Sequence, residues 1–252
     1  MKWISFDLDG TLMQNPFVGY VFPELEDIIS KNINTDESVV DLLVAEHNHR
    51  MQQGKIVEAY DWDDIVQKLL KKYELSLQVN VEEIVIRHSV APKIYLLDDD
   101  VINSLQYLKD KGYYLAVVTN GFYKYQAPVL KQLKIYDLFD LIVTPDRCGY
   151  AKPNAKILDE VRKKGQVVAH VGDRIDHDIV MANEEGIQSI FINRRLPSEV
   201  EKLTIDERIH WSGLKDFLLE KLRKELGQEV QWKETVLPNK IITNIAELKD
   251  IF

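Results

Sequence analysis

The sequence has little cysteine and no excess of positive charge. Cys148 is the only cysteine among 252 residues, so no disulfide can form within the chain, and we expect a reducing compartment, the cytoplasm. The chain has 32 Lys and Arg residues against 41 Asp and Glu residues, a formal net charge of −9. This balance disfavours sequence-independent binding to nucleic acid or to an anionic membrane. We therefore predict no nucleic-acid partner, and phosphate chemistry would require a local positive site or a metal ion.

Long apolar runs are also missing. No stretch approaches the roughly 20 residues of a transmembrane helix, and Asp7 follows the first apolar residues too soon for a signal-peptide core. Hydrophobic residues make up 45% of the chain and charged residues 29%, which is the composition of a globular protein rather than a disordered one. The length predicts one large or two modest domains, and no membrane partner is expected.

What the sequence does contain is an alternation of short apolar runs with amphipathic segments. The strand-like runs lie at 2–6, 113–118, 140–143, 167–171 and 188–192. Helical patterns lie between the later runs, at 99–111, 155–164 and 176–185, and a glycine follows each of them. This order predicts an α/β fold: a Rossmann-like, doubly wound parallel sheet with helices on both faces.

Residues 13–98 interrupt the alternation with helical signals alone. The expected first-turn or capping residues of four helices are Pro23, Asn34 or Thr35, Asp61 and Asn80. We interpret residues 13–98 as an inserted all-α cap domain that acts as a lid. Residues 1–12 and 99–252 then form a discontinuous core domain.

The last part of the chain is less informative. Residues 196–226 have helical spacing, and 229–237 fit either a strand or a loop. Residues 239–252 indicate a short apolar segment and a final helix over 245–251. Within the core, residues 196–240 remain an unassigned C-terminal extension that could bind a partner, and no oligomeric state is predicted.

Polar residues suited to phosphate chemistry follow the predicted strands or precede a predicted helix. They are Asp7 and Asp9 after the first strand, Thr119 and Asn120 after the second, Lys152 before the helix over 155–164, and Asp173 after the strand at 167–171. In an open parallel sheet, the loops at the carboxyl ends of the strands converge on one crevice. We therefore expect these side chains to meet in space.

Such a cluster has a specific chemical use. Carboxylates that lie close together raise one another's pKa unless a cation neutralises them, and hard oxygen ligands of this kind suit Mg²⁺. Thr119 and Lys152 would supply a hydroxyl and a positive charge for phosphoryl oxygens. The set indicates phosphoryl transfer with Mg²⁺ as the cofactor.

Four short motifs resemble, in order, those of the haloacid dehalogenase-like (HAD) hydrolase superfamily. They are Asp7-Leu-Asp9-Gly-Thr11, Thr119-Asn-Gly121, Lys152-Pro153 and Gly172-Asp173 with Asp178. The long gap between the first two motifs is similar to that in the helical-cap (C1-type) phosphatase branch. The resemblance extends over about residues 1–195 and implies a Rossmann-like core with an inserted helical cap.

The resemblance also implies a role for each motif residue. Asp7 would attack phosphorus and become an aspartyl phosphate, and Asp9 would act as general acid and then as general base. Residues implied to hold Mg²⁺ are Asp7, Asp9 through its backbone carbonyl, and Asp173. Residues implied to bind the phosphate are Asp7, Gly10, Thr119, Asn120, Gly121 and Lys152. Asp178 would hold Lys152 or a metal-bound water.

The function implied by the resemblance is a Mg²⁺-dependent phosphatase that acts on a small phosphorylated metabolite, a sugar phosphate or a nucleoside monophosphate, with the cap closing over the leaving group. Asp9 favours this function over dehalogenation, because a leaving alkoxide needs a proton and true dehalogenases lack an aspartate at this position. The alternatives are a phosphomutase or a dehalogenase on the same scaffold, and a non-enzymatic phospho-receiver or binding protein. The insertion and the position of Asp7 after the first strand argue against a receiver.

Other polar residues have plainer interpretations. His47 and His49 are two residues apart and cannot face each other on a helix, which predicts a solvated helix face. His170 is expected to be a hydrogen-bonded histidine at a strand end, and 98–100 an acidic cluster at a helix start. Asp176 could cap a helix or join the metal site. The cap residues expected to contact substrate are Met13–Tyr20, with Arg87 or His88.

Overall fold

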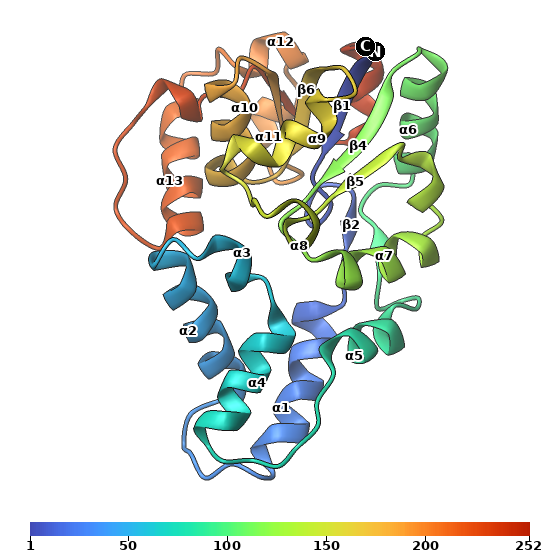
Figure 1. Cartoon of the computed structure of the whole chain (residues 1–252). Helices are drawn as coiled ribbons and strands as arrows, with labels where there is room; N and C mark the ends of the chain where they lie inside the picture. Colours follow the sequence, from blue (N-terminus) through green and yellow to red (C-terminus); the bar gives the residue numbers. More distant parts are fainter.

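A six-stranded, fully parallel β-sheet forms the centre of the protein in the computed structural model, which describes residues 1–252 (Figure 1). The strands run across the sheet in the order β5-β4-β1-β6-β7-β8. Their bounds are β1 Lys2–Phe6, β4 Tyr114–Val118, β5 Leu141–Val143, β6 Gln166–Gly172, β7 Gln188–Ile192 and β8 Lys240–Ile242. The predicted α/β class and doubly wound parallel sheet are confirmed.

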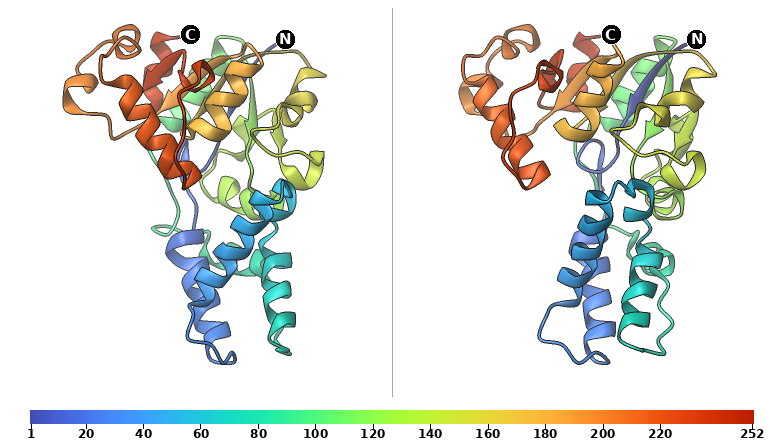
Figure 2. Two further views of the ribbon diagram at one scale, coloured as in Figure 1. Left: turned by 90° about the vertical axis from the view of Figure 1, so that its left-hand side faces the viewer. Right: turned by 60° about the vertical axis from the view of Figure 1, so that its left-hand side comes forward.

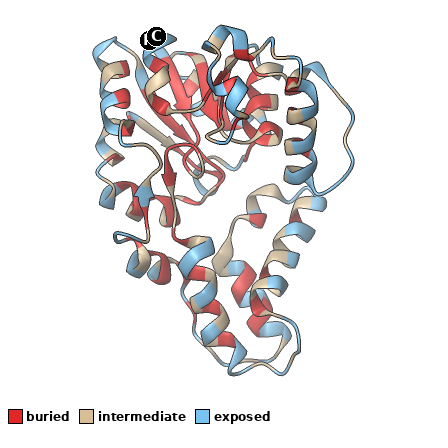
Figure 3. Ribbon diagram, turned by 180° about the vertical axis from the view of Figure 1, so that it is seen from behind, coloured by how far each residue is buried: buried red, intermediate tan, exposed pale blue.

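Both faces of the sheet are buried, which explains why its strands are almost continuously apolar. Ile4 and Phe6 of β1 belong to one apolar cluster, and Trp3 belongs to another. The helices that contribute to the first cluster are α6 (Val101–Asp110), α7 (Tyr123–Gln132) and the short η6 (Ile245–Asp250). Those that contribute to the second are η3 (Ala155–Leu158), α9 (Asp159–Arg162) and α10 (Val180–Glu184). Figure 3 shows the buried residues gathered in the sheet and on the inward sides of these helices.

The strand order reverses direction at β1. The chain passes from β1 to β4 and β5 on one side of the sheet, and then to β6, β7 and β8 on the other side. Such a switch point leaves a crevice outside the carboxyl ends of the strands. Phe6, the last residue of β1, pairs with Val117 of β4 and with Val171 of β6. The residues that follow these three strands are therefore neighbours by register.

Residues 13–98 form a helical body next to the carboxyl ends of the strands, which we call the insertion (Figure 1). Its elements are β2 Met13–Gln14, η1 Phe17–Val21, α1 Phe22–Ser30, α2 Val39–Gln52, α3 Ile56–Ala59, α4 Trp62–Lys72, α5 Val81–His88 and β3 Tyr95–Leu96. Strands β2 and β3 pair antiparallel, so the outgoing and returning segments lie side by side. Both chain termini lie at the end of the molecule away from the insertion (Figure 2).

Most of the predicted helix starts in the insertion are confirmed. Pro23 lies in the first turn of α1, where its missing N–H costs no hydrogen bond. The Asp61 side chain accepts a hydrogen bond from the backbone N–H of Asp64 at the start of α4. Asn80 caps α5 in the same way by accepting from the N–H of Glu83 over 3.1 Å.

The predicted cap of the second helix is wrong, because α2 begins at Val39 rather than directly after Asn34 or Thr35. Ser38 is the capping residue, and its hydroxyl donates to Glu26 Oε2 over 2.8 Å. The same oxygen of Glu26 accepts the N–H of Val40 over 2.9 Å. A carboxylate from α1 therefore fixes where α2 starts.

The C-terminal segment adds one strand and several helices to the core. Strand β8 pairs in parallel with β7, whereas the sequence indicated only a short apolar segment there. Residues 229–237 form a loop with one short turn, η5 (Glu234–Val236), and the final helix is the 3₁₀ turn η6. Helices α11 (Ser198–Glu201) and α12 (Ile205–Arg208) precede α13 (Leu214–Leu226), whose Leu214, Leu218 and Leu222 pack near the end of β7. None of the helices has both the length and the apolar character that a membrane span requires.

Candidate active site

Lys152 lies between two carboxylates at the carboxyl edge of the sheet. Its Nζ donates to Asp7 Oδ1 and to Asp178 Oδ1, each over 2.6 Å, and its side chain is only 2% exposed. Burial acts to lower the pKa of Lys152, but the charges of Asp178 and Asp7 outweigh burial and raise it above its ordinary range. A charged lysine is therefore held between residues that are 145 and 26 positions away in the chain.

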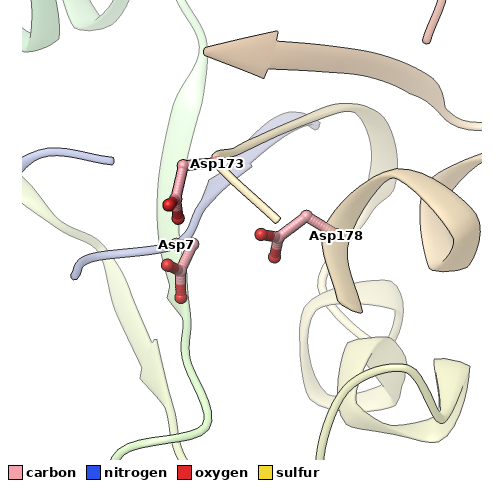
Figure 4. Close-up of side chains that lie close together, drawn as sticks. All are labelled: Asp7, Asp173 and Asp178. Atoms are coloured by element: carbon pink, nitrogen blue, oxygen red, sulfur yellow. The ribbon is translucent and has the colours of Figure 1, made fainter. Parts of the chain in front are cut away.

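Asp173, which follows β6, completes a cluster with Asp7 and Asp178 (Figure 4). One carboxylate oxygen from each of the three lies within 4.8 Å of the others. Burial, followed by the charges of Asp7 and Asp178, raises the pKa of Asp173 to about 7. Burial also raises the pKa of Asp7, although Lys152 opposes the change. Such a cluster is one that a divalent cation could neutralise.

Asp178 differs from the other two carboxylates because protein groups already satisfy it. Its Oδ1 accepts from Lys152 and lies 3.0 Å from His170 Nε2, and its Oδ2 accepts the backbone N–H of Arg174 over 3.1 Å. Burial acts to raise the pKa of Asp178, but Lys152 and His170 outweigh burial and hold it far below its usual range. Asp178 is thus placed to hold Lys152 and the loop after Asp173.

His170 is fully buried within β6 and has a partner on each ring nitrogen. Its Nδ1 lies 2.8 Å from Ser5 Oγ, and its Nε2 faces Asp178. The prediction of a hydrogen-bonded histidine is confirmed, but β6 continues past His170 to Gly172, so the histidine does not lie at the strand end.

Asp9 has one satisfied carboxylate oxygen and one without a partner. Gln126 Nε2 donates to Asp9 Oδ2 over 2.6 Å, whereas the buried Oδ1 has no hydrogen-bond partner. Burial, and then the charge of Asp7, raises the pKa of Asp9 to about 6. A side chain at Gly121 would overlap Gln126, so glycine at that position leaves room for this contact. Asp9 can therefore carry a proton next to Asp7 near neutral pH.

Thr119 and Asn120 follow β4 and border the same space. The Asn120 amide donates to the Lys152 carbonyl over 2.9 Å and accepts the Lys152 N–H over 2.7 Å. This reciprocal pair joins the loop after β4 to the loop that carries the lysine. Gly121 N–H donates to Thr119 Oγ1 over 3.3 Å. The Asn120 side chain is thus hydrogen-bonded to the Lys152 backbone, and Thr119 lines the same cavity as Asp7 and Lys152.

Gly10 allows a close approach between two loops. Its φ is +81°, and a Cβ at this position would lie 2.5 Å from Asp173 Oδ2. The absence of a side chain at Gly10 therefore leaves room for the Asp173 carboxylate. Gly172 has a similar relation to Asp178, whose carboxylate a Cβ would overlap.

Arg194, which follows β7, holds the loop after Asp9 by hydrogen bonds. It donates to the backbone carbonyls of Gly10 over 2.9 Å and of Thr11 over 2.8 Å. It also forms an ion pair with Asp98 at 2.6 Å, and Asp98 accepts the N–H of Ile245 as well. Asp98, predicted only as part of an acidic cluster at a helix start, therefore connects the end of the insertion to Arg194 and Ile245 of the core.

A cavity of about 380 Å³ opens between these core residues and the insertion. The insertion residues that line it are Asn15, Phe17, Val18, Phe22, His47, Tyr60 and Trp62. Residues 13–20 were predicted to contact substrate, and three of them, Asn15, Phe17 and Val18, line this cavity. Arg87 and His88, for which the same contact was predicted, pair with Glu24 and do not line this cavity.

The prediction that His47 lies on a solvated helix face is wrong. His47 lines the cavity and its ring stacks on Trp62, with centroids 5.3 Å apart and planes inclined by 15°. His49, two residues later, is exposed as expected. The helical period predicts that the two histidines lie on different sides of the helix, but it does not show which of them faces the cavity.

Glu225 of α13 supports the site from the C-terminal segment. Its carboxylate accepts the backbone N–H groups of Ile175 and Asp176 over 2.9 and 3.1 Å, and it pairs with Lys221 over 3.0 Å. Asp176 is not a member of the carboxylate cluster, and its carboxylate accepts two hydrogen bonds from Arg174, over 2.9 and 2.7 Å. No local sequence signal could identify Glu225, because its partners lie about fifty residues away.

Comparisons with known proteins agree with this geometry. A model of the haloacid dehalogenase-like hydrolase family matches residues 1–186. A glyceraldehyde 3-phosphate phosphatase of Methanocaldococcus jannaschii is 29% identical over 199 residues, 76% of this chain and 85% of that protein. A phosphoglycolate phosphatase of Aliivibrio fischeri is 27% identical over 201 residues, 75% of this chain and 82% of that protein. The crystal structure of a HAD phosphatase from Thermococcus onnurineus matches 100% of this chain and 97% of its own, with a TM-score of 0.70 at 24% identity.

Proposed function

Since this chain belongs to the haloacid dehalogenase-like hydrolases, we propose that it is a Mg²⁺-dependent phosphatase that hydrolyses a small phosphomonoester through a covalent intermediate on Asp7. Two similar proteins carry phosphatase names, and both align over three quarters of this chain or more. The observation that carries the mechanism is the pair formed by Asp7 and Asp9, in which one carboxylate contacts Lys152 and the other has a free, buried oxygen and a pKa near 6.

In the first step, a carboxylate oxygen of Asp7 attacks phosphorus and the ester P–O bond breaks. Asp9, protonated on its free oxygen, gives its proton to the departing alkoxide. Lys152 compensates the charge of Asp7 as an anionic phosphate approaches it. The Thr119 hydroxyl and the nearby backbone N–H groups would bind the phosphoryl oxygens, and Thr119 lines the same cavity as Asp7 and Lys152.

In the second step, water attacks the phosphorus of the aspartyl phosphate. Asp9, now a carboxylate, takes the water proton, and the bond between phosphorus and the Asp7 oxygen breaks. Inorganic phosphate leaves, and both aspartates return to their starting protonation states. A second acid is not required, since one group gives a proton and then recovers it.

The donor set fits Mg²⁺. Asp7 and Asp173 supply hard oxygen ligands, and their raised pKa values are those expected of clustered carboxylates without a bound cation. Asp178, in contrast, already forms an ion pair with Lys152. We assign the ion to Asp7, Asp173 and the backbone carbonyl of Asp9. Bound there, it would neutralise the carboxylates and the charge that develops on the phosphoryl group.

We further propose that residues 13–98 are a cap domain and that residues 1–12 and 99–252 are the core. The insertion supplies the aromatic side of the cavity, and the two strands β2 and β3 join it to the core. This arrangement supports closure over the leaving group of a small phosphorylated metabolite, with bulk water excluded from the reacting atoms.

The test is phosphate release from para-nitrophenyl phosphate by the full chain, with Mg²⁺ and with excess chelator. We expect turnover only with Mg²⁺, and its loss in Asp7→Asn at unchanged circular dichroism. Asp99→Asn, which alters an exposed aspartate at the start of α6, is the matched control and should keep full activity. Activity in Asp7→Asn would refute the mechanism, and phosphorylation by acetyl phosphate without turnover of esters would indicate a receiver. Halide release or an isomerised sugar phosphate would indicate a dehalogenase or a mutase.

A further inference from the structure

The two ends of the active-site cavity differ in charge. The core end carries Asp7, Asp9 and Lys152, whereas the insertion contributes no Asp, Glu, Lys or Arg side chain to the lining. Its contribution is aromatic and neutral. A ligand whose phosphate lies on Lys152 would therefore place the rest of its structure against uncharged groups.

Three aromatic rings form a fixed wall at the insertion end. Phe22 meets Trp62 edge to face, with centroids 4.9 Å apart, and Phe17 lies 5.7 Å from Phe22 and 6.0 Å from Trp62. Phe17 also packs edge to face on Tyr125 of α7, at 5.4 Å, which connects the wall to the core. Such contacts favour a preformed surface that accepts a flat or apolar group.

His47 adds one hydrogen-bond acceptor to this wall. Its Nδ1 lies 2.6 Å from the carbonyl oxygen of Ala59, and a carbonyl can only accept, so the proton of the ring is on Nδ1. Burial, and then the charge of Arg174, lowers the pKa of His47, so the ring is neutral at physiological pH. The remaining nitrogen, Nε2, has no partner in the protein and can accept a hydrogen bond from a ligand.

Arg174 is the one other cation besides Lys152 in the cavity lining, and it is already paired. Its Nε and Nη2 both donate to the carboxylate of Asp176, in the two-point geometry that neutralises a guanidinium well. Only its Nη1 has no partner in the protein. A carboxylate or a second phosphate on the substrate would therefore meet a guanidinium whose charge Asp176 already compensates, rather than a free cation.

We propose that the substrate is a phosphate ester of an uncharged, ring-bearing alcohol that presents an N–H or O–H donor to His47 Nε2, which is the chemistry of a nucleoside monophosphate. The proposal rests on the phosphatase function proposed above. A cavity of about 380 Å³ lies within the range of roughly 300–1,000 Å³ for small-ligand sites. The ring would lie against Phe17, Phe22 and Trp62, and the phosphate between Asp7 and Lys152.

The first experiment compares kcat/KM of the Mg²⁺-loaded full chain for uridine 5′-monophosphate, glyceraldehyde 3-phosphate and 2-phosphoglycolate. We expect the nucleotide to be preferred over 2-phosphoglycolate by tenfold or more. Equal values, or a preference for either of the short substrates, would overturn the proposal.

The second experiment tests His47 directly. His47→Phe keeps a ring next to Trp62 but removes the acceptor, and the loss of one neutral hydrogen bond predicts a rise in KM for the nucleotide of roughly tenfold, with little change in kcat. His49→Phe, on the exposed side of the same helix, is the matched control and should match the wild type. If His47→Phe does not fold, His47→Asn retains a donor for the Ala59 carbonyl and lacks an acceptor at the Nε2 position.

The outcomes separate the two levels of the proposal. An unchanged KM for the nucleotide in a folded His47 variant would refute the role of His47 while para-nitrophenyl phosphate is still hydrolysed. Failure of the wild type to hydrolyse any ester with Mg²⁺ would refute the phosphatase function itself, and the substrate class with it.

Discussion

Replacing Gly10 by alanine should weaken the metal site without replacing any of its ligands. The Cβ of an alanine would lie 2.5 Å from Asp173 Oδ2, whereas ordinary contacts begin near 3.4 Å, so the carboxylate must move by about 0.9 Å. A misplacement of about 1 Å in an active site can reduce the rate by roughly 100-fold. We therefore expect Gly10→Ala to raise the Mg²⁺ concentration for half-maximal activity by at least tenfold.

Gly149→Ala provides a matched control for backbone strain. Gly149 has a φ of +79°, almost the +81° of Gly10, but a Cβ there would have no heavy atom within 4 Å. Both substitutions should cost about 1–2 kcal/mol of stability, because an L-residue is strained in the left-handed region. Only the first should alter the dependence on Mg²⁺.

The assay is a Mg²⁺ titration of phosphate release by the wild type and both variants, with calorimetric melting curves to measure stability. Similar losses in melting temperature and a change in Mg²⁺ dependence only for Gly10→Ala would support the account. If Gly10→Ala and Gly149→Ala had the same Mg²⁺ dependence, the close approach of Gly10 to Asp173 would have no part in metal binding.

Two further predictions concern the loop after β6. The pKa of Asp173 is raised to about 7 without metal, and a ligand must lose its proton to bind, so Mg²⁺ affinity measured by calorimetric titration should fall up to tenfold per pH unit below about 7. Affinity that stays constant between pH 8 and pH 5.5 would contradict this. Glu225→Gln should also weaken Mg²⁺ binding, because the N–H groups of Ile175 and Asp176 lose a charged acceptor, whereas Glu220→Gln on the exposed side of α13 should not. If the two substitutions changed Mg²⁺ affinity equally, the proposed role of Glu225 in supporting the metal site would be refuted.

The positions of the clustered carboxylates Asp7 and Asp173 could be predicted because they depend on strand ends. Asp7 and Asp173 each follow a buried apolar strand, and the direction of a parallel sheet then fixes where they meet. Local capping signals were sufficient for Asp61 and Asn80, whose partners lie three residues away. In these cases the decisive interaction is either close in sequence or imposed by topology.

Features fixed by distant side chains could not be predicted. The start of α2 depends on Glu26, which lies in another helix and binds Ser38 and the N–H of Val40. Strand β8 has three residues, too few to show a period, and pairing with β7 defines it. The inward direction of His47 depends on Trp62 and on the Ala59 carbonyl, neither of which is evident from the spacing of the two histidines.

The most direct test of the central claim is to trap the intermediate on Asp7. The enzyme is mixed with substrate and Mg²⁺, quenched rapidly and treated with borohydride, which reduces an acyl phosphate to an alcohol but leaves a free carboxylate unchanged. Peptide mass spectrometry should then find the reduced side chain at Asp7, and no reduction at Asp9 or Asp173. A reduced residue at another position, or turnover of substrate with no trapped species at Asp7, would contradict the proposed mechanism.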